Sequence, residues 1–311
     1  MLHKQSFHML NSLRHMFAHL RRYTLRERLQ WRWGRLVRRK RLAWWRSQTG
    51  KQQVEVSIQD GVRMQLYTDS YLSQLIYCDG YELSEREFLK YFLKPGDIFV
   101  DVGANIGLFT VLAGRYVGAK GAVYAFEPCA KTYEGLLANV RLNGLTNVSC
   151  HQAALSDHPG RRDLTVSLDG FDACNSFSQP VFGEQFVSEP VDSITWDEFA
   201  DEHGLAGRVA MMKIDVEGWE TFVVEGGART LGREDAPVLQ IEFNDQSALP
   251  AGVSGRKLYG ALESLGYKMF IYDAKSRTLV PEPPRDSYQW MNMIAAKRPG
   301  YAITRLMGGA R

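Results

Sequence analysis

The 311-residue chain is poor in cysteine and contains no long hydrophobic run. Its four cysteines form no Cys-x-x-Cys pair and have no histidines nearby at zinc-ligand spacing: Cys78, Cys129, Cys150 and Cys174. We therefore expect reduced, buried thiols and no disulfide framework. No apolar stretch approaches the length of a membrane span, and the first residues lack an apolar region with a small-residue cleavage site. These absences predict an intracellular, cytoplasmic protein without a spanning helix.

Acidic residues are nearly absent from the first 51 residues. This segment contains one acid, Glu27, and fourteen lysines and arginines, whereas the rest of the chain contains 34 acids and 24 bases. The net charge of +3 is therefore the sum of a strongly basic head, residues 1–51, and an acidic body, residues 52–311. Apolar residues recur in the head at helical spacing, and it contains four of the seven tryptophans: Trp31, Trp33, Trp44 and Trp45. The pattern predicts a basic amphipathic helical extension over residues 1–51.

Two interpretations of this extension have equal support from the residues. Basic side chains with interfacial tryptophans are typical of a helix that lies on an anionic membrane, here as peripheral contact at the inner membrane face through residues 1–51. The apolar stripe would otherwise pack on the body or on a second subunit, with the arginines in solvent. A polyanion such as nucleic acid is a further candidate for the basic side chains.

Strand and helix patterns alternate from residue 98 onward. This alternation predicts an α/β fold with a doubly wound, mainly parallel, seven-stranded Rossmann-like sheet. The last two strands are joined by a loop too short for a helix, so they should form an antiparallel edge hairpin. The expected strands cover residues 98–103, 122–127, 148–154, 209–215, 237–243, 268–273 and 288–296.

The chain is expected to have four parts. The regular pattern lapses between residues 156 and 194, where Arg162–Leu168 reads as an added strand and Gly170–Pro190 as an aromatic inserted loop over a site. The expected parts are the basic extension 1–51, an N-terminal cap region 52–97, the main domain 98–298 with the inserted loop 156–194, and a C-terminal tail 299–311. The cap region should begin with a small pair of extended segments, residues 54–58 and 63–67.

The run Ile-Phe-Val-Asp-Val-Gly-Ala-Asn-Ile-Gly at residues 98–107 reads as a buried strand that ends in a glycine-punctuated turn. Gly103 and Gly107 allow close backbone approach, and Asn105 tolerates unusual dihedral angles. Ligands of open α/β sheets gather at such a strand end. Asp101 would repel a phosphate but suits an ammonium or a hydroxyl, and the turn lacks the Gly-x-Gly-x-x-Gly spacing that seats a pyrophosphate.

Two further acids follow later strands. Glu127 ends the second strand about twenty residues after the turn, where an acid can hold both hydroxyls of a ribose. Asp157 follows Ala153–Ser156 and either accepts a hydrogen bond from an adenine amine or caps a turn. These features indicate a nucleoside that carries an amino-acid arm.

Over residues 80–245 the chain resembles the FkbM-type methyltransferases, a branch of the S-adenosyl-L-methionine-dependent class. The resemblance rests on Asp101–Gly107, Glu127-Pro128, Asn139 with Asn143, Ala153-Leu155-Ser156-Asp157, Val191–Ile194, Lys213–Glu220 and Ile241-Glu242. It implies a class I methyltransferase-like fold that binds S-adenosyl-L-methionine, and O-methylation of a sugar, polyketide or related hydroxyl. The implied cofactor-binding residues are Asp101, Gly103, Ala104, Asn105, Gly107, Glu127 for the ribose, Asp157 for the adenine, and Asp215.

Methyl transfer to a hydroxyl needs alignment of the reacting atoms and a base for the hydroxyl proton. Asp215 and Glu217 end a strand that faces the expected methyl position, so they are the candidate catalytic residues. A sufficient alternative role for Glu217 is charge complementarity at a helix N-terminus. Asp215, Glu242 and Asn244 offer the hard oxygen ligands of a divalent metal, but we expect no metal site.

We therefore expect an O-methyltransferase that acts on a hydroxyl of a saccharide, glycolipid or related small molecule. An RNA methyltransferase with the basic head as an electrostatic arm is one alternative, and a non-catalytic binding module with the same fold is another. No Asn-Pro-Pro-Tyr-like base-flipping element follows the fourth strand, and residues 215–218 are acidic. A nucleic-acid partner is for these reasons not expected.

Overall fold

The computed structural model describes residues 25–48, 50–78 and 80–308, and the chain divides into two units, residues 1–50 and 51–311. In the first unit the described segment is the helix α2 (Leu25–Ser47), on which Arg39 and Lys40 are exposed. The helical pattern expected for residues 1–24 lies outside the described residues. The amphipathic extension as a whole therefore stays a prediction, as does its membrane contact.

The second unit is built on a sheet with the strand order β12-β11-β13-β10-β9-β3-β4-β5. Its five adjacent parallel strands are β3 (Ile98–Val102), β4 (Ala122–Phe126), β5 (Val148–His151), β9 (Val209–Ile214) and β10 (Val238–Phe243). Every residue of β10 is buried, as expected of a parallel strand covered on both faces. The α/β class with a large, mostly parallel sheet is confirmed.

The expected count of seven strands is wrong, because eight strands form this sheet among the described residues. β11 (Lys268–Asp273) pairs antiparallel with β13 (Met291–Ala296), as predicted, and on its other side with β12 (Thr278–Pro281). The sequence pattern places these residues in the loop between the last two expected strands, which contains Pro281, Pro283 and Pro284. Its Leu279 is buried, and the β-branched Thr278 and Val280 favour an extended backbone.

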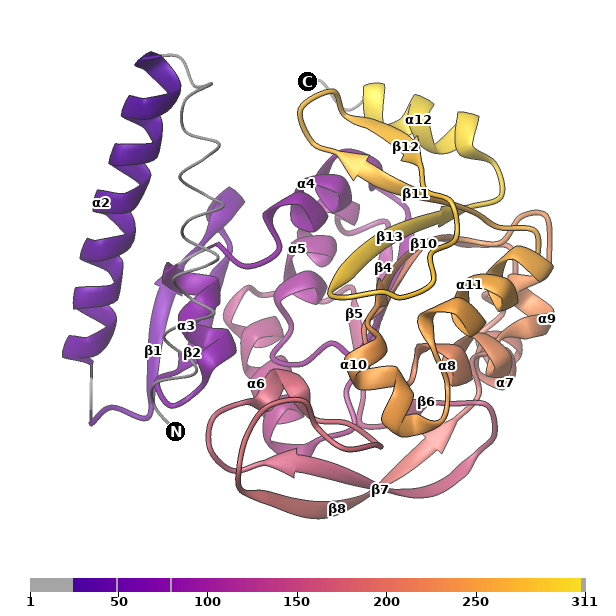
Figure 1. Cartoon of the computed structure of the whole chain (residues 1–311), viewed down its shortest axis with the longest axis horizontal. Coiled ribbons are helices and arrows are strands. Elements are labelled where there is room, and N and C mark those ends of the chain that lie inside the picture. Colours follow the sequence, from indigo (N-terminus) through magenta and orange to yellow (C-terminus); the bar gives the residue numbers. More distant parts are fainter. Residues whose placement is uncertain (1–24, 49, 79, 309–311) are drawn as a thin grey trace. The chain divides into compact units, whose positions relative to one another are not determined.

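Two groups of helices flank this sheet (Figure 1). One group contains α4 (Leu83–Phe92), α5 (Leu108–Val117), α6 (Ala130–Leu142) and α12 (Pro299–Met307). The other contains α7 (Trp196–Glu202), α8 (Glu220–Gly226), α9 (Ala228–Leu231) and α11 (Gly255–Ser264), and the short α10 (Asp245–Ala248) follows β10. The main hydrophobic core lies between the sheet and the second group. None of the helices among the described residues is sufficiently long and apolar to cross a membrane.

The segment before β3 forms an antiparallel hairpin, β1 (Gln53–Ser57) with β2 (Arg63–Tyr67), as expected, followed by α3 (Tyr71–Cys78) and α4. The fully buried Asn139 of α6 fastens this hairpin to the central turn. Its Oδ1 accepts a hydrogen bond from Gln65 N at 2.6 Å, and its Nδ2 donates to Ile106 O at 2.8 Å. These hydrogen bonds place the N-terminal region, residues 52–97, beside the turn after β3, at one wall of the candidate functional site.

The segment after β5 forms a second sheet, in which β8 (Phe186–Ile194) lies between β6 (Ala154–Leu155) and β7 (Gly160–Ser167). The added strand expected at Arg162–Leu168 is confirmed as β7, which begins two residues earlier and ends at Ser167. The expected loop is shorter than Gly170–Pro190, because β8 already begins at Phe186. The third strand of the main sheet is also shorter than predicted, since residues 154–155 pair with β8 instead.

Candidate functional site

A cavity opens where β3, β4 and β9 end, with about 920 Å³ of space counted to its open mouth. Its walls come from the turn after β3, the end of β4, residues 153–155, the stretch from β9 to Trp219, and the segment before α4. Residues 172–177 of the β7–β8 connection complete the lining.

The turn after β3 has a backbone that only certain residues can adopt. Gly103 has φ +81°, and a Cβ there would lie 1.9 Å from the carbonyl oxygen of Asp215. Gly107 has φ +88°, and its Cβ would lie 2.7 Å from Leu136 Cδ1. Asn105 adopts φ +48°, a conformation that asparagine tolerates better than most residues. The turn can therefore lie close against β9 and leave room for a ligand.

Glu127 holds this turn from the end of β4. Its carboxylate accepts hydrogen bonds from Asn105 N at 2.8 Å, Cys129 N at 3.0 Å and Thr132 Oγ1 at 2.7 Å. Burial raises the pKa of Glu127 to about 7, although these donors oppose the rise. A carboxylate has about four acceptor positions, so capacity remains for a ligand hydroxyl.

Asp101 lies at the floor of the cavity and is 1% exposed. Thr110 Oγ1 donates to its Oδ2 at 2.6 Å. Burial raises the pKa of Asp101, and the positive charge of Lys213 opposes that shift.

The structure brings most of the predicted site residues together. Those that line the cavity are Asp101, Gly103, Ala104, Asn105, Glu127, Asp215 and Glu217. Gly107 lies outside the lining and supports the turn by its packing. Asp157 also lies outside it, where it accepts from Arg162 Nη2 and Ser156 Oγ, both at 2.8 Å. The adenine contact of Asp157 stays a prediction.

Lys213 and Asp215 form a buried ion pair at the end of β9, with 2.5 Å between Nζ and Oδ2. Burial by itself would lower the pKa of Lys213, but the charges of Asp215, Glu82 and Asp101 raise it overall. Lys213 is therefore a fixed cation that faces several carboxyl groups.

Glu217 follows with φ +53°. Burial and the charge of Asp215 raise the pKa of its carboxyl well above the usual value. The carbonyl of Glu217 accepts from Ser176 Oγ at 2.7 Å, which ties the lining loop to this turn. Glu220, rather than Glu217, receives the turn's amides, from Val216 N at 2.9 Å and Gly218 N at 3.3 Å. Glu220, and not Glu217, therefore has the structural role at the helix N-terminus that was the alternative to a catalytic role for Glu217.

Two acids in the lining were missed by sequence analysis. Glu82 precedes α4 with φ +49°, and Asn292 Nδ2 donates to its Oε1 at 3.1 Å. Burial raises the pKa of Glu82 to about 7, against the effect of Lys213. Asp172 accepts from Ser70 Oγ at 2.8 Å, and its carbonyl accepts from Asn105 Nδ2 at 3.1 Å. Neither acid follows a strand, so the strand-end rule could not identify them.

The candidate metal ligands differ from those considered in the sequence analysis. Asn244, which we had grouped with Asp215 and Glu242, uses its side chain to cap α10 by accepting from Gln246 N at 3.2 Å and donating to Ser247 Oγ at 2.9 Å. Its place beside the two acids is taken by Glu220.

The model of the family described as "Methyltransferase FkbM domain" matches residues 101–269, more than half of the chain. "Methyltransferase 1" of Beauveria bassiana is 29% identical over 152 residues, which are 42% of this chain and 59% of that protein. "31-O-demethyl-FK506 methyltransferase FkbM" of Streptomyces tacrolimicus is 40% identical over 81 residues, 25% of this chain and 29% of that protein. The chain therefore spans less than two thirds of these curated relatives. The crystal structure of M. jannaschii TYW2 in complex with AdoMet matches with a TM-score of 0.39 and 15% identity, covering 79% of this chain and 84% of that one.

Proposed function

This chain belongs to the methyltransferase FkbM domain family, whose cofactor is S-adenosyl-L-methionine, and we propose that it transfers the cofactor's methyl group to a hydroxyl of a saccharide, glycolipid or related small molecule. The observation that carries the proposal is the position of Glu127. Its carboxylate lines the cavity and accepts a hydrogen bond from Asn105 N of the glycine turn.

The residues of the cavity fit this cofactor. The carboxylate of Glu127 keeps acceptor capacity for a ribose hydroxyl, and Asp101 suits an ammonium group better than a phosphate. At Gly103 the absence of a side chain lets the turn pack on β9 and leaves the backbone of residues 103–105 as part of the wall. When bound, S-adenosyl-L-methionine supplies a methyl group that is activated by a sulfonium.

The chain's own task is to orient the acceptor oxygen and remove its proton. As the bond from that oxygen to the methyl carbon forms and the carbon–sulfur bond breaks, the hydroxyl proton needs an acceptor. Asp215 is held by Lys213 at 2.5 Å, so its charge is already compensated. We propose that Glu217, which lines the cavity next to Asp215, accepts the proton of the acceptor hydroxyl. Asp215 acts as the positioning residue of this pair.

An aromatic platform adjoins the lining and supports an acceptor that contains a ring. The rings of Phe171 and Phe182 stack at 6.0 Å between centroids, and those of Phe182 and Trp290 at 5.6 Å. Phe182 and Trp290 are 45% and 46% exposed, and Phe171 immediately precedes Asp172 of the cavity. Trp290 has φ +50°, which is unusual for a bulky residue, and such strain is concentrated at functional positions.

The choice of oxygen as methyl acceptor has support from one relative. The printed name of the Streptomyces tacrolimicus protein refers to a 31-O-demethyl compound. The RNA alternative has less support, because the acids around the cavity, Glu82, Asp101, Asp215 and Glu217, would repel a phosphate chain.

The test is calorimetric titration of the full chain with S-adenosyl-L-methionine and with its demethylated product. We expect micromolar binding that is lost in Glu127→Ala and kept in the control Glu134→Ala, an exposed acid on α6. Labelled methyl transfer is then measured on saccharides, glycolipids, a hydroxylated macrolide and RNA. Absence of cofactor binding contradicts the proposed enzymatic function. Transfer to RNA alone contradicts the proposed small-molecule acceptor.

A further inference from the structure

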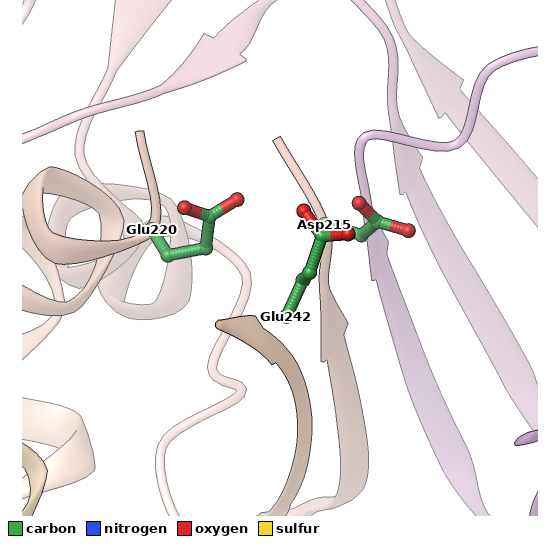
Figure 2. Close-up of side chains that lie close together, drawn as sticks. All are labelled: Asp215, Glu220 and Glu242. Atoms are coloured by element: carbon green, nitrogen blue, oxygen red, sulfur yellow. The ribbon is translucent and has the colours of Figure 1, made fainter. Parts of the chain in front are cut away.

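Three carboxylates from different elements converge beside the cavity: Asp215 after β9, Glu220 at the start of α8 and Glu242 on β10. One oxygen of each lies within 4.8 Å of the other two. Figure 2 shows the carboxylates of Asp215 and Glu242 next to one another and that of Glu220 turned toward them. Oxygens that bind one divalent cation at about 2.0–2.6 Å lie within such a distance of each other.

The sheet register explains why two of these acids meet. β9 and β10 are parallel neighbours in which Lys213 is opposite Gln240 and Ile214 opposite Ile241. The next pair in this register is Asp215 and Glu242, so the two side chains leave the sheet at the same level. Glu220 is brought to them by the turn whose amides it accepts.

The charge of the cluster is not balanced by the side chains around it. Glu242 is 8% exposed, and its buried Oε2 has no hydrogen-bond partner within the described part of the chain. Lys213 is already paired with Asp215. An unpaired buried carboxylate is costly, so such a group is normally matched by a cation or a proton. The carboxyl groups that share this region are Glu82, Asp101, Asp215, Glu217, Glu220 and Glu242.

Each member of the triad keeps an oxygen for a ligand. Asp215 uses Oδ2 for Lys213, which leaves Oδ1. Glu220 uses Oε1 for the two turn amides, which leaves Oε2. Glu242 has its unpartnered Oε2. The donors are hard oxygens without histidine or cysteine, which suits Mg²⁺ and Mn²⁺ better than Zn²⁺.

We propose that Asp215, Glu220 and Glu242 bind one divalent cation, Mg²⁺ or Mn²⁺, beside the cavity. The cation neutralises the unpaired charge of Glu242, and water or the acceptor completes its coordination. Asp215 also lines the cavity, so an acceptor hydroxyl bound to this cation would release its proton more readily to Glu217. This use in catalysis rests on the proposed function, whereas the binding of the cation does not.

The experiment uses the full chain after chelator treatment, without cofactor or acceptor. Manganese chloride is titrated in, and free Mn²⁺ is counted by electron paramagnetic resonance. We expect one Mn²⁺ per chain, displaced by excess Mg²⁺, and at least tenfold weaker binding in Glu242→Gln. The matched control is Glu234→Gln, because Glu234 is an exposed acid shortly before β10. It should bind Mn²⁺ like the wild type.

Two results would overturn the cation site. The first is no stoichiometric Mn²⁺ binding by the wild type. A higher melting temperature of Glu242→Gln would then show that the cluster holds protons instead. The second is equal Mn²⁺ affinity of the wild type and Glu242→Gln.

Cofactor binding is measured on the same samples by calorimetry. Loss of the cation site with cofactor binding intact leaves the proposed function standing, and intact Mn²⁺ binding without cofactor binding contradicts the proposed function alone.

Discussion

At the scale of single residues, Gly103 is the position with the least freedom to change. Its φ of +81° is strained for any other residue, and an added Cβ would meet the Asp215 carbonyl at 1.9 Å. We expect Gly103→Ala to lower the free energy of unfolding by roughly 3 kcal/mol and to abolish cofactor binding. Urea unfolding measures the first effect. Gly144→Ala is the control, because Gly144 has φ +61° and open space around its Cβ position. Equal destabilisation by both changes would show that the close approach to β9 is unimportant.

Glu127 makes stability depend on pH. Burial raises its pKa to about 7 from the usual 4.5, so between these values the native protein retains a proton that the unfolded chain has released. This contribution is full below about pH 4.5 and is lost as the pH rises through 7. The stability of Glu127→Gln relative to wild type should therefore increase by about 2 kcal/mol from pH 5 to pH 8 in urea unfolding. Glu134→Gln should show no such change, and a flat difference for Glu127→Gln would contradict the assignment.

Glu217 and Asp215 have different roles in the proposed reaction. Glu217→Gln keeps the shape of the side chain but removes the proton acceptor, so we expect kcat to fall by about 10²–10⁴ with little change in cofactor affinity. Single-turnover transfer of labelled methyl measures this loss. Asp215→Asn would instead unpair the buried Lys213 and lower stability as well. If Glu217→Gln kept full kcat, the proton acceptor would be another group.

At the scale of elements, the connection between β7 and β8 contributes both to the cavity and to the aromatic platform. We expect Phe182→Ala and Trp290→Ala each to raise the KM for the acceptor about tenfold, because the acceptor ring would lose its stacking surface. The affinity for S-adenosyl-L-methionine should not change. Steady-state kinetics and calorimetry measure the two quantities. Leu168→Ala is the control, since Leu168 is 62% exposed on the same segment. A similar effect of all three changes would contradict a specific platform.

The prediction of elements succeeded where the pattern was local. The parallel strands and the hairpin β1–β2 carry apolar or alternating residues whose burial depends on their own sequence. β12 was missed because these four residues of a proline-containing loop become a strand only by pairing with β11. Ala154 was assigned to the wrong sheet for the same reason, since Ser193 of β8 pairs with it from nearly forty positions further along the chain.

At the scale of the whole molecule, the chain divides by charge near the boundary between its two units. We propose that the basic unit contacts an anionic membrane, so the full chain should float with anionic liposomes and not with neutral ones. Arg39→Glu combined with Lys40→Glu, both exposed on α2, should weaken flotation markedly at low salt. The difference from the wild type should shrink at higher salt, because salt screens exposed charges. Lys120→Glu combined with Lys275→Glu makes the same charge change on exposed residues of the other unit and should have little effect. Failure of the wild type to float would contradict the proposal.

The sequence by itself determined the fold class, the glycine turn and the acids at strand ends, because each depends on neighbouring residues and on a regular period. Asp101, Glu127 and Asp215 could be named in advance since parallel strands end at one edge of a sheet. Tertiary structure alone decided that Glu82 and Asp172 enter the cavity and that Asp157 is paired with Arg162 outside it. It also brought Glu220 to Asp215 and Glu242. These contacts depend on how distant segments cross, which no local pattern records.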